Sequence, residues 1–235
     1  MNSTPHYKIY KDYVSDYDLL RERMDYENNL LKQFTSVADF NGADVVEFAA
    51  GTGKITQQIL PFVKSVKAYD LSEQMLNFAK EKLTKTEYSN WGLEVADNTT
   101  IPLPNNCADI IIEGWSLGYM VAAAGKEWKT VIDKVLHEMM RLLKDKGTII
   151  IAGTLGTGAH NPKPPNKELE NLYHYLEKEK GFSVTPWFKT DYKFQSVEEA
   201  EKLVRFFWSD GFGDYIKEKK LTILPECTAI WYWEK

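Results

Sequence analysis

The stretch Val45-Val46-Glu47-Phe48-Ala49-Ala50-Gly51-Thr52-Gly53 joins a short apolar run to a turn that contains two glycines. Residues 44–48 have the length and apolar character of a buried β-strand, and a helix over residues 55–60 follows the turn and ends near Pro61. Glycine lets the backbone turn tightly and approach a ligand closely. This order of strand, glycine turn and helix predicts a ligand-binding loop at the carboxyl end of the first strand of an α/β sheet.

The rest of the chain continues this alternation of strands and helices. The runs Ile110-Ile111-Ile112 and Ile149-Ile150-Ile151 are apolar throughout, which is typical of strands covered on both faces. Alternating strands and helices predict a mostly parallel sheet. The further strands that we expect cover residues 63–69, 91–96, 109–113, 148–152, 221–224 and 228–233, and the further helices cover residues 72–83, 126–143, 167–180 and 196–208.

The length of 235 residues suits a single domain over residues 1–235. Residues 1–40 carry a rough helical stripe of apolar side chains up to Asn41-Gly42, which predicts an N-terminal helical cover. Residues 153–165 are rich in glycine and proline and precede a predicted helix, so we interpret residues 153–195 as an insertion of loop and helix on the substrate side. We expect both segments to cover the ligand site.

Composition excludes several classes of protein. The formal net charge of −5 gives no overall basic footprint for nucleic acid. No apolar run approaches the ~18 residues that a membrane-spanning helix needs, and no signal peptide is present, so the expected compartment is the cytoplasm. Cys107 and Cys227 lie far apart, which disfavours a disulfide framework and a metal site.

The aromatic residues near the C-terminus, such as Phe207 and Trp208, suit either core packing or an apolar pocket.

The loop after the first strand does not match the two commonest nucleotide-binding loops. A phosphate-cradling loop ends in Gly-Lys followed by Ser or Thr, but Ile55 follows Gly53-Lys54, and Phe48 stands at the position of the first glycine. A dinucleotide-binding loop has the pattern GxGxxG, and counting from Gly51 places Thr56 at its third glycine. A nicotinamide-dependent oxidoreductase therefore remains only as an alternative.

Acidic residues follow the next two predicted strands. Asp70 lies 23 residues (70 − 47) after Glu47, close to the spacing at which an acid grips ribose hydroxyls in nucleotide-binding folds. Asp97 and Asn98 follow the third strand. Because parallel strands end at the same edge of a sheet, these side chains should meet the glycine loop there.

Taken together, these strings resemble class I S-adenosylmethionine (SAM)-dependent methyltransferases. Residues 45–53 are similar to the family's first motif, an acidic residue followed by GxGxG, with Ala49 in place of the first glycine. The resemblance implies a Rossmann-like, seven-stranded, mostly parallel sheet with an antiparallel edge strand and helices on both faces. Residues 68–76, 96–112 and 142–148 are similar to later motifs of the same class I family. In the last third of the chain, residues 189–194, 196–200 and 224–228 resemble the type-11 methyltransferase group.

The resemblance also implies roles for the residues that match the motifs. Gly51 and Gly53, with Ala49, would leave room for the methionine part of SAM, and Glu47 would order the loop or reach the ligand's ammonium. Asp70 would accept hydrogen bonds from both ribose hydroxyls. The residues expected around the adenine are Leu71, Met75, Asp97 and Asn98.

The remaining candidates are assigned with less guidance from motifs. Glu113 and Trp115 end the fourth strand and would contact the cofactor, whereas Ser116 and Tyr119 would contact the substrate. The family often places an N-terminal tyrosine against the methionine end of SAM, and the candidate for this role is Tyr17. His160, in the loop after the fifth strand, is the candidate general base, with an exposed loop histidine as the alternative.

The sequence therefore predicts a SAM-dependent methyltransferase with S-adenosylhomocysteine (SAH) as product and no metal. Methyl transfer is an in-line displacement in which positioning does most of the work, so no catalytic triad is required. The expected acceptor is a small molecule with an O, N or C nucleophile, and the expected protein is a monomer or homodimer without nucleic-acid or membrane partners. A non-catalytic SAM-binding module is the alternative from a different class.

Overall fold

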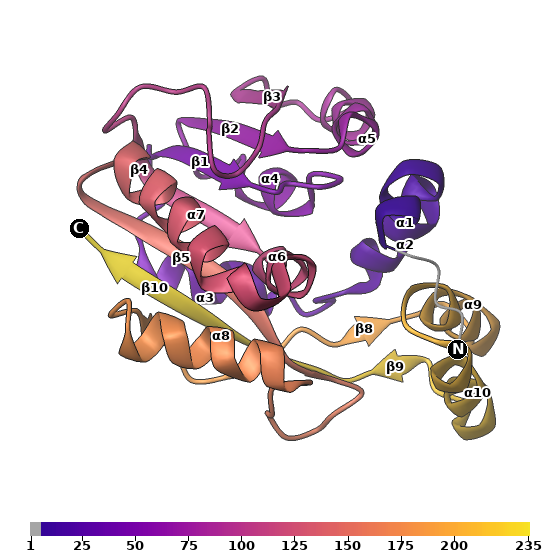
Figure 1. Ribbon diagram of the computed structural model, residues 1–235. Helices are drawn as coiled ribbons and strands as arrows, with labels where there is room; N and C mark the ends of the chain where they lie inside the picture. The colour runs from indigo at the N-terminus through magenta and orange to yellow at the C-terminus, as the bar shows by residue number, and fades with distance from the viewer. Residues whose placement is uncertain (1–5) are drawn as a thin grey trace.

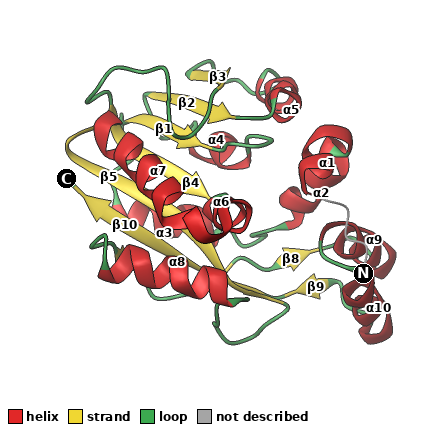
Figure 2. Ribbon diagram, viewed as in Figure 1, coloured by secondary structure: helices red, strands yellow, loops and turns green. Residues whose placement is uncertain are grey.

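The computed structural model describes residues 6–235 and is built around an eight-stranded sheet (Figures 1 and 2). The strand order is β3-β2-β1-β4-β5-β10-β6, and β7 also pairs with β10. Strands β1 to β5 all run parallel to one another, whereas β10 runs antiparallel to β5. The strands are β1 (Asp44–Phe48), β2 (Ser65–Asp70), β3 (Trp91–Val95), β4 (Ala108–Gly114), β5 (Leu143–Thr157), β6 (Ser183–Val184), β7 (Phe188–Lys189) and β10 (Glu226–Glu234).

This architecture confirms the predicted fold class. The sheet has eight strands where seven were expected, because the short strands β6 and β7 both pair along β10. Strand β5 is also longer than the predicted residues 148–152, because it is hydrogen-bonded to β4 on one side and to β10 on the other.

Helices cover both faces of the sheet (Figure 2). Alternate residues of β1 point to opposite faces: Val46 joins a core with α7 and α8, and Val45 joins one with α3 and α4. The helices are α1 (His6–Asp12), α2 (Val14–Arg23), α3 (Asn29–Val37), α4 (Lys54–Ile59), α5 (Glu73–Leu83), α6 (Leu117–Ala124), α7 (Trp128–Leu142), α8 (Lys167–Lys178), α9 (Val197–Phe207) and α10 (Asp210–Lys219).

The N-terminal helical segment is divided by a tight turn that the apolar stripe did not reveal. Asp25 is buried with a left-handed φ of 59°, and its carboxylate accepts hydrogen bonds from the backbone N–H groups of Asn29 (2.9 Å) and Leu30 (3.0 Å). These bonds satisfy donors at the start of α3, so the chain turns sharply between α2 and α3. The first five residues of the predicted cover lie outside the described part of the chain.

A smaller subdomain lies beyond the carboxyl ends of β1, β2 and β4 (Figure 1). It consists of α1, α2, α9, α10 and a two-stranded sheet of β8 (Tyr192–Lys193) and β9 (Ile223–Leu224), and we call it the cover. Its core contains Leu20 of α2 together with Leu203 and Ile216 of α9 and α10. Thus α1 and α2 lie where the sequence predicted a cover, and residues 197–224 form a part of it that was not predicted. Within residues 6–235, no helix has the length and apolarity needed to span a bilayer.

Candidate active site

The loop after β1 has three residues in the left-handed region. Ala49, Gly51 and Gly53 have φ values of 51°, 56° and 76°. A Cβ atom on Gly53 would lie 3.1 Å from the Cβ of Ala79, so glycine there permits close packing of α4 against α5. Ala49 carries a Cβ in a conformation that costs an L-residue roughly 1–2 kcal/mol. The first motif of class I methyltransferases has glycine at this position, and glycine adopts a positive φ without this cost.

Asp70 holds this loop from the end of β2. Its Oδ2 accepts the N–H of Gly51 at 2.8 Å, and its Oδ1 accepts the N–H of Ser72 at 2.8 Å. Burial raises the pKa of the Asp70 carboxyl above its usual range. Ser72 caps α5 by accepting the N–H of Met75, so the acid, the loop and the helix start are fixed together.

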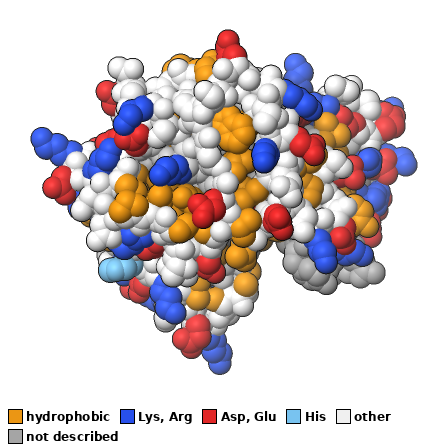
Figure 3. All heavy atoms as spheres, turned by 90° about the horizontal axis from the view of Figure 1, so that it is seen from above, with side chains coloured by type: hydrophobic (Ala, Val, Ile, Leu, Met, Phe, Trp, Pro, Cys, Tyr) orange, Lys and Arg blue, Asp and Glu red, His pale blue; other side chains and the backbone are white. Residues whose placement is uncertain are grey.

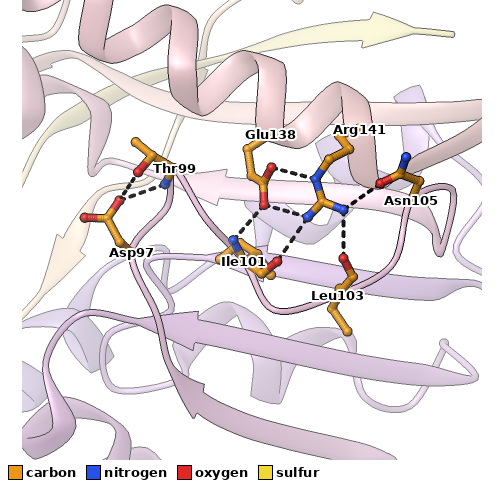
Figure 4. Close-up of polar contacts among 7 residues, drawn as sticks. All are labelled: Asp97, Thr99, Ile101, Leu103, Asn105, Glu138 and Arg141. Carbon is orange, nitrogen blue, oxygen red and sulfur yellow. Dashed lines mark hydrogen bonds and ion pairs between the residues drawn. The ribbon is translucent and has the colours of Figure 1, made fainter.

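Asp97 and Asn98 lie in the loop after β3, which α7 holds in place (Figure 4). Asp97 accepts hydrogen bonds from the N–H and hydroxyl of Thr99, which lower the pKa of its carboxyl. Later in the same loop, the N–H of Ile101 donates to Glu138 at 2.6 Å. The Arg141 guanidinium donates hydrogen bonds to Glu138 and to three further acceptors in the loop. Those acceptors are the carbonyls of Ile101 and Leu103 and the side chain of Asn105.

The segment after β4 turns through Trp115, whose φ is 63°, into α6. Glu113 is fully buried, and its Oε1 accepts the N–H groups of Ser116 and Leu117 at the start of the helix. Burial raises the pKa of the Glu113 carboxyl to about 7. Glu113 therefore anchors α6, which carries Tyr119.

The cover supplies the opposite wall. The rings of Tyr10 and Tyr17 lie 5.4 Å apart at 80°, and the Arg21 guanidinium lies 4.7 Å from the centre of the Trp115 ring. Lys54, the residue after Gly53, donates to the carbonyls of Arg21 (2.8 Å) and Met24 (2.7 Å). The helix that follows the glycine loop is therefore bonded directly to the end of α2.

These elements enclose a cavity of about 500 Å³. It brings together eleven of the predicted site residues, from all four strand ends and from α2. They are Tyr17, Ala49, Gly51, Asp70, Leu71, Met75, Asp97, Asn98, Trp115, Ser116 and Tyr119.

A second cavity of about 950 Å³ lies between α6, α8 and the cover. Glu113 lines this second cavity rather than the first. The two cavities share walls, so we treat them as adjoining chambers. The shared residues are Trp115, Tyr119, Thr154, Thr157, Phe207 and Trp208.

Three predicted site residues lie outside both cavities. Gly53 packs against α5, as described above. Glu47 is buried beneath the loop, where it accepts a hydrogen bond from the Thr56 hydroxyl, and burial raises the pKa of its carboxyl to about 8. Glu47 thus orders the loop from below. His160 is exposed on the segment after β5, so the geometry offers no support for its predicted role as general base.

Among the polar residues of the first cavity that were not singled out from the sequence are Arg21, Thr154, Tyr192 and Glu226. Glu226 gave one usable signal, because it is a lone acid at the start of the apolar strand β10. Arg21 and Tyr192 gave none, because their positions depend on how the cover folds over the sheet.

The polar groups of the first cavity fit a ligand with ribose hydroxyls and no phosphate. The Lys54 ammonium is already bonded to two carbonyls, and the Gly51 N–H points at the Asp70 carboxylate. A phosphate near the loop would therefore meet a negative charge and would lack the cation that phosphate loops supply. Hydroxyl donors suit the same carboxylate well. The fold is that of an α/β protein, and the lining of its first cavity suits a nucleoside-type ligand without phosphates.

Comparison with known proteins shows a similarity to methyltransferases over the first part of the sheet. Residues 46–151 match the model of a methyltransferase domain family. The chain is 24% identical over 198 residues to phosphoethanolamine N-methyltransferase of Triticum aestivum, a match that covers 83% of this chain and 35% of that protein. It is 24% identical over 173 residues to demethylmenaquinone methyltransferase of Lactococcus lactis, covering 71% and 63%. This chain thus spans less than two thirds of either relative.

Solved structures agree with this assignment at the level of the fold. A SAM-dependent methyltransferase from Aquifex aeolicus superposes with a TM-score of 0.59 at 18% identity, covering 94% of this chain and 98% of that one. Residues 46–151 therefore resemble a methyltransferase domain, and the chain has the fold of a SAM-dependent methyltransferase of known structure. The alternative of a nicotinamide cofactor gains no support from these comparisons.

Proposed function

We propose that this protein is a SAM-dependent methyltransferase that methylates a small molecule at an O, N or C nucleophile. The observation that carries this proposal is the second chamber, which adjoins the cofactor cavity at Trp115 and Tyr119. A module that only binds SAM needs one cavity. A transferase needs room for an acceptor beside it, because the nucleophile must reach the methyl group in line with the bond that breaks.

Bound SAM would supply an electrophilic methyl group and would leave as SAH. Asp70 would bind the ribose hydroxyls, and Leu71 and Met75 would flank the adenine, with Asp97 and Asn98 at its polar edge. A Cβ atom added to Gly51 would lie 3.9 Å from the Tyr17 hydroxyl, so glycine at this position leaves space between the loop and the cover for the methionine part of SAM. The aromatic side chains of the cover would exclude water from the reacting groups.

Several observations support a small acceptor. The two cavities lie in the size range of small-molecule sites, which is roughly 300–1,000 Å³. The relatives reported above are methyltransferases named for two small molecules, phosphoethanolamine and demethylmenaquinone. On the face shown in Figure 3, side chains of both charges are interspersed, and the net charge is −5, which disfavours a nucleic-acid substrate. A cytoplasmic location and a monomeric or homodimeric state stay predictions.

Titration calorimetry with SAM and SAH tests the cofactor site. Wild type should bind both ligands. Asp70→Ala should weaken binding by about 1.5–3 kcal/mol, which is about 10- to 150-fold in affinity, because the variant lacks the charged hydrogen-bond acceptor. Asp70→Asn separates the charge from the loop contacts, since its amide oxygen can still accept a backbone N–H. Asp39→Ala, an exposed acid before β1, is the control and should bind like wild type. Absence of binding by wild type would contradict the proposal.

A further inference from the structure

Glu226 is a buried acid with one oxygen left without a partner. It pairs with Thr157 at the start of β10, it is only 2% exposed, and it lines the first cavity. Its Oε1 accepts a hydrogen bond from the Thr154 hydroxyl, whereas its Oε2 has no hydrogen-bond partner among residues 6–235. Thr154 and Thr157 line both chambers, so Glu226 lies at their junction.

Such an oxygen is costly unless a ligand satisfies it. A buried polar group without a hydrogen bond destabilises a fold by about 1–3 kcal/mol, and a buried charge by more. Burial raises the pKa of the Glu226 carboxyl to about 7, so the group can exchange a proton near neutral pH. A ligand that donates a hydrogen bond at the junction would remove the cost.

The other carboxylates that line the first cavity are already engaged. Asp70 uses both oxygens to accept backbone N–H groups. Asp97 is exposed and bonded to Thr99. In the second cavity, Glu113 also has a free Oε2, but its other oxygen anchors α6. Glu226 is therefore the acid best placed between the cofactor cavity and the acceptor chamber.

Arg21 supplies the opposite charge in the same cavity. Among the described residues, its guanidinium forms no ion pair within 4.0 Å, and it lies 4.7 Å from the centre of the Trp115 ring. It is close enough to Glu226 to lower the pKa of that carboxyl. A guanidinium repels a cationic ammonium acceptor and stabilises negative charge that develops on an oxygen. The cavity thus favours a weakly acidic hydroxyl over an amine.

The second chamber indicates what the rest of the acceptor looks like. Its walls are mostly apolar and aromatic, and they include Leu117 and Val121 of α6, Leu172 of α8, and Phe212 of α10. Aromatic walls suit an aromatic ring, which they contact by stacking or edge-on. The aromatic side chains Trp115, Phe207 and Trp208 line both chambers.

We propose that the acceptor is a phenol with an apolar body, that Glu226 accepts its proton, and that Arg21 stabilises the resulting oxygen charge. This proposal rests on the proposed methyltransferase function. The phenol O–H bond breaks and its proton passes to Oε2 of Glu226. The oxygen lone pair forms the new O–CH₃ bond as the carbon–sulfur bond of SAM breaks, and that bond's electron pair stays on sulfur. The products are an aryl methyl ether and SAH.

Several titratable groups surround Glu226 and would influence its titration. They come from helices and strands of both halves of the molecule, and Asp191 also accepts the Glu226 N–H at 2.9 Å. These groups are Arg21 of α2, Tyr119 of α6, Tyr173 of α8, Asp191, Tyr192 of β8 and Cys227 of β10.

Turnover of matched acceptors tests the proposal. SAH formation would be measured with phenol, 4-nitrophenol and 1-naphthol, and with the matching amines aniline, 4-nitroaniline and 1-naphthylamine. Wild type should methylate the phenols and should lose kcat/KM as pH falls through about 7, because protonated Glu226 cannot accept a proton. Glu226→Gln should lower kcat/KM by about 10²–10⁴ and remove this inflection, while its SAH affinity stays within about 2-fold of wild type.

Two variants control this experiment. Glu177→Gln alters a glutamate outside both cavities whose Oε1 accepts the Trp231 indole N–H, a bond that glutamine can keep, and it should retain the rate and the pH profile. Glu113→Gln tests the competing acid. Loss of the inflection in Glu113→Gln with its retention in Glu226→Gln would overturn the proposal.

Arg21 is tested without any turnover. In the SAH complex, the visible absorbance of bound 4-nitrophenol measures how much of it is phenolate. Arg21→Met should lower that fraction at fixed pH and leave SAH affinity unchanged. An unchanged phenolate fraction with weakened SAH binding would mean that Arg21 serves the cofactor, and the proposal would be wrong.

The outcomes separate this proposal from the one on which it rests. Failure of wild type to bind SAM or SAH would remove the methyltransferase function itself. Binding of SAM with methylation of the amines alone, with no phenol methylated, or with full activity in Glu226→Gln would leave the methyltransferase function standing and refute the phenol proposal.

Discussion

The cofactor-binding loops and the cover line the same cavity, but they are held by different kinds of contact. The loops after β1 and β2 are fixed by bonds between residues close in sequence: Asp70 accepts the N–H groups of Gly51, 19 residues away, and of Ser72, 2 residues away. The cover is held between distant parts of the chain: Arg23 and Glu199 form a two-bond ion pair across 176 residues. One half is therefore encoded locally, and the other depends on the completed fold.

The largest effect should come from the core of the cover. Leu203 is fully buried there, so Leu203→Ala should lower the free energy of unfolding by about 2–5 kcal/mol. Ile111→Ala, in the centre of the sheet, is the matched variant, with a fully buried side chain of similar size. Urea unfolding measures both. SAH affinity should survive in Leu203→Ala, and a parallel loss of stability and SAH affinity would show that the two halves cannot be separated.

The second effect concerns the loop that carries Asp97 and Asn98. Arg141→Ala removes the guanidinium that ties this loop to α7 and leaves the nearly buried Glu138 without its partner. We expect a loss of about 2–3 kcal/mol in the free energy of unfolding, with weaker SAH binding. Arg141→Lys keeps the charge without the fork of donors and should recover only part of the loss. Unchanged stability in Arg141→Ala would contradict this account.

The third effect is a dependence of stability on pH that arises beneath the glycine loop. The pKa of Glu47 is about 8 in the folded protein against 4.5 for an ordinary glutamate, because the side chain is buried. Between these values the folded state holds a proton that the unfolded state has lost. The free energy of unfolding should therefore fall as pH rises, by about 1.4 kcal/mol per pH unit for this group. Urea unfolding from about pH 5 to about pH 8 should show a shallower slope in Glu47→Gln, and an identical slope would refute the assignment.

The smallest effect is expected at Ala49. Glycine would remove the strain that Ala49 has at its left-handed φ of 51°, which stabilises the fold. Glycine also loses more conformational entropy on folding than alanine does, which offsets part of this gain. Ala49→Gly should thus stabilise the protein by about 0.5–1 kcal/mol without weakening SAH binding. Thermal unfolding with and without SAH measures this, and a destabilised variant would show that the Cβ of Ala49 makes a contact worth more than the strain.

The same division separates what the sequence could predict from what it could not. Asp70, Asp97 and Asn98 line the cavity as expected, because their positions follow from where parallel strands end. His160 was chosen for its chemistry in a loop whose direction nothing local determines, and it is exposed. Arg21 and Glu226 stand more than 200 residues apart, so only the folded chain brings them to one cavity.

The helices that escaped prediction have a similar explanation. Helix α10 contains Gly211 and Gly213, which weaken its helical pattern, but Ser209 caps its start and a Cβ on Gly213 would lie 2.7 Å from the Arg205 side chain. Close packing against α9 therefore requires the glycine that obscures the helix in the sequence. Helix α6 follows Trp115, and the buried Glu113 fixes its start.

The bonds from Lys54 to the end of α2 would link the two binding events proposed above, that of the cofactor and that of the acceptor. Lys54 follows the glycine loop directly, and one of the carbonyls that it holds belongs to Arg21. A ligand that orders the loop also orders the residue that anchors α2. Such an effect is reciprocal: if a ligand in the first chamber raises the affinity of the second chamber for its ligand, the second ligand raises the affinity of the first chamber by the same factor. Under the proposed function, the Lys54 ammonium and the two carbonyls that it holds are one physical connection between the cofactor site and the cover.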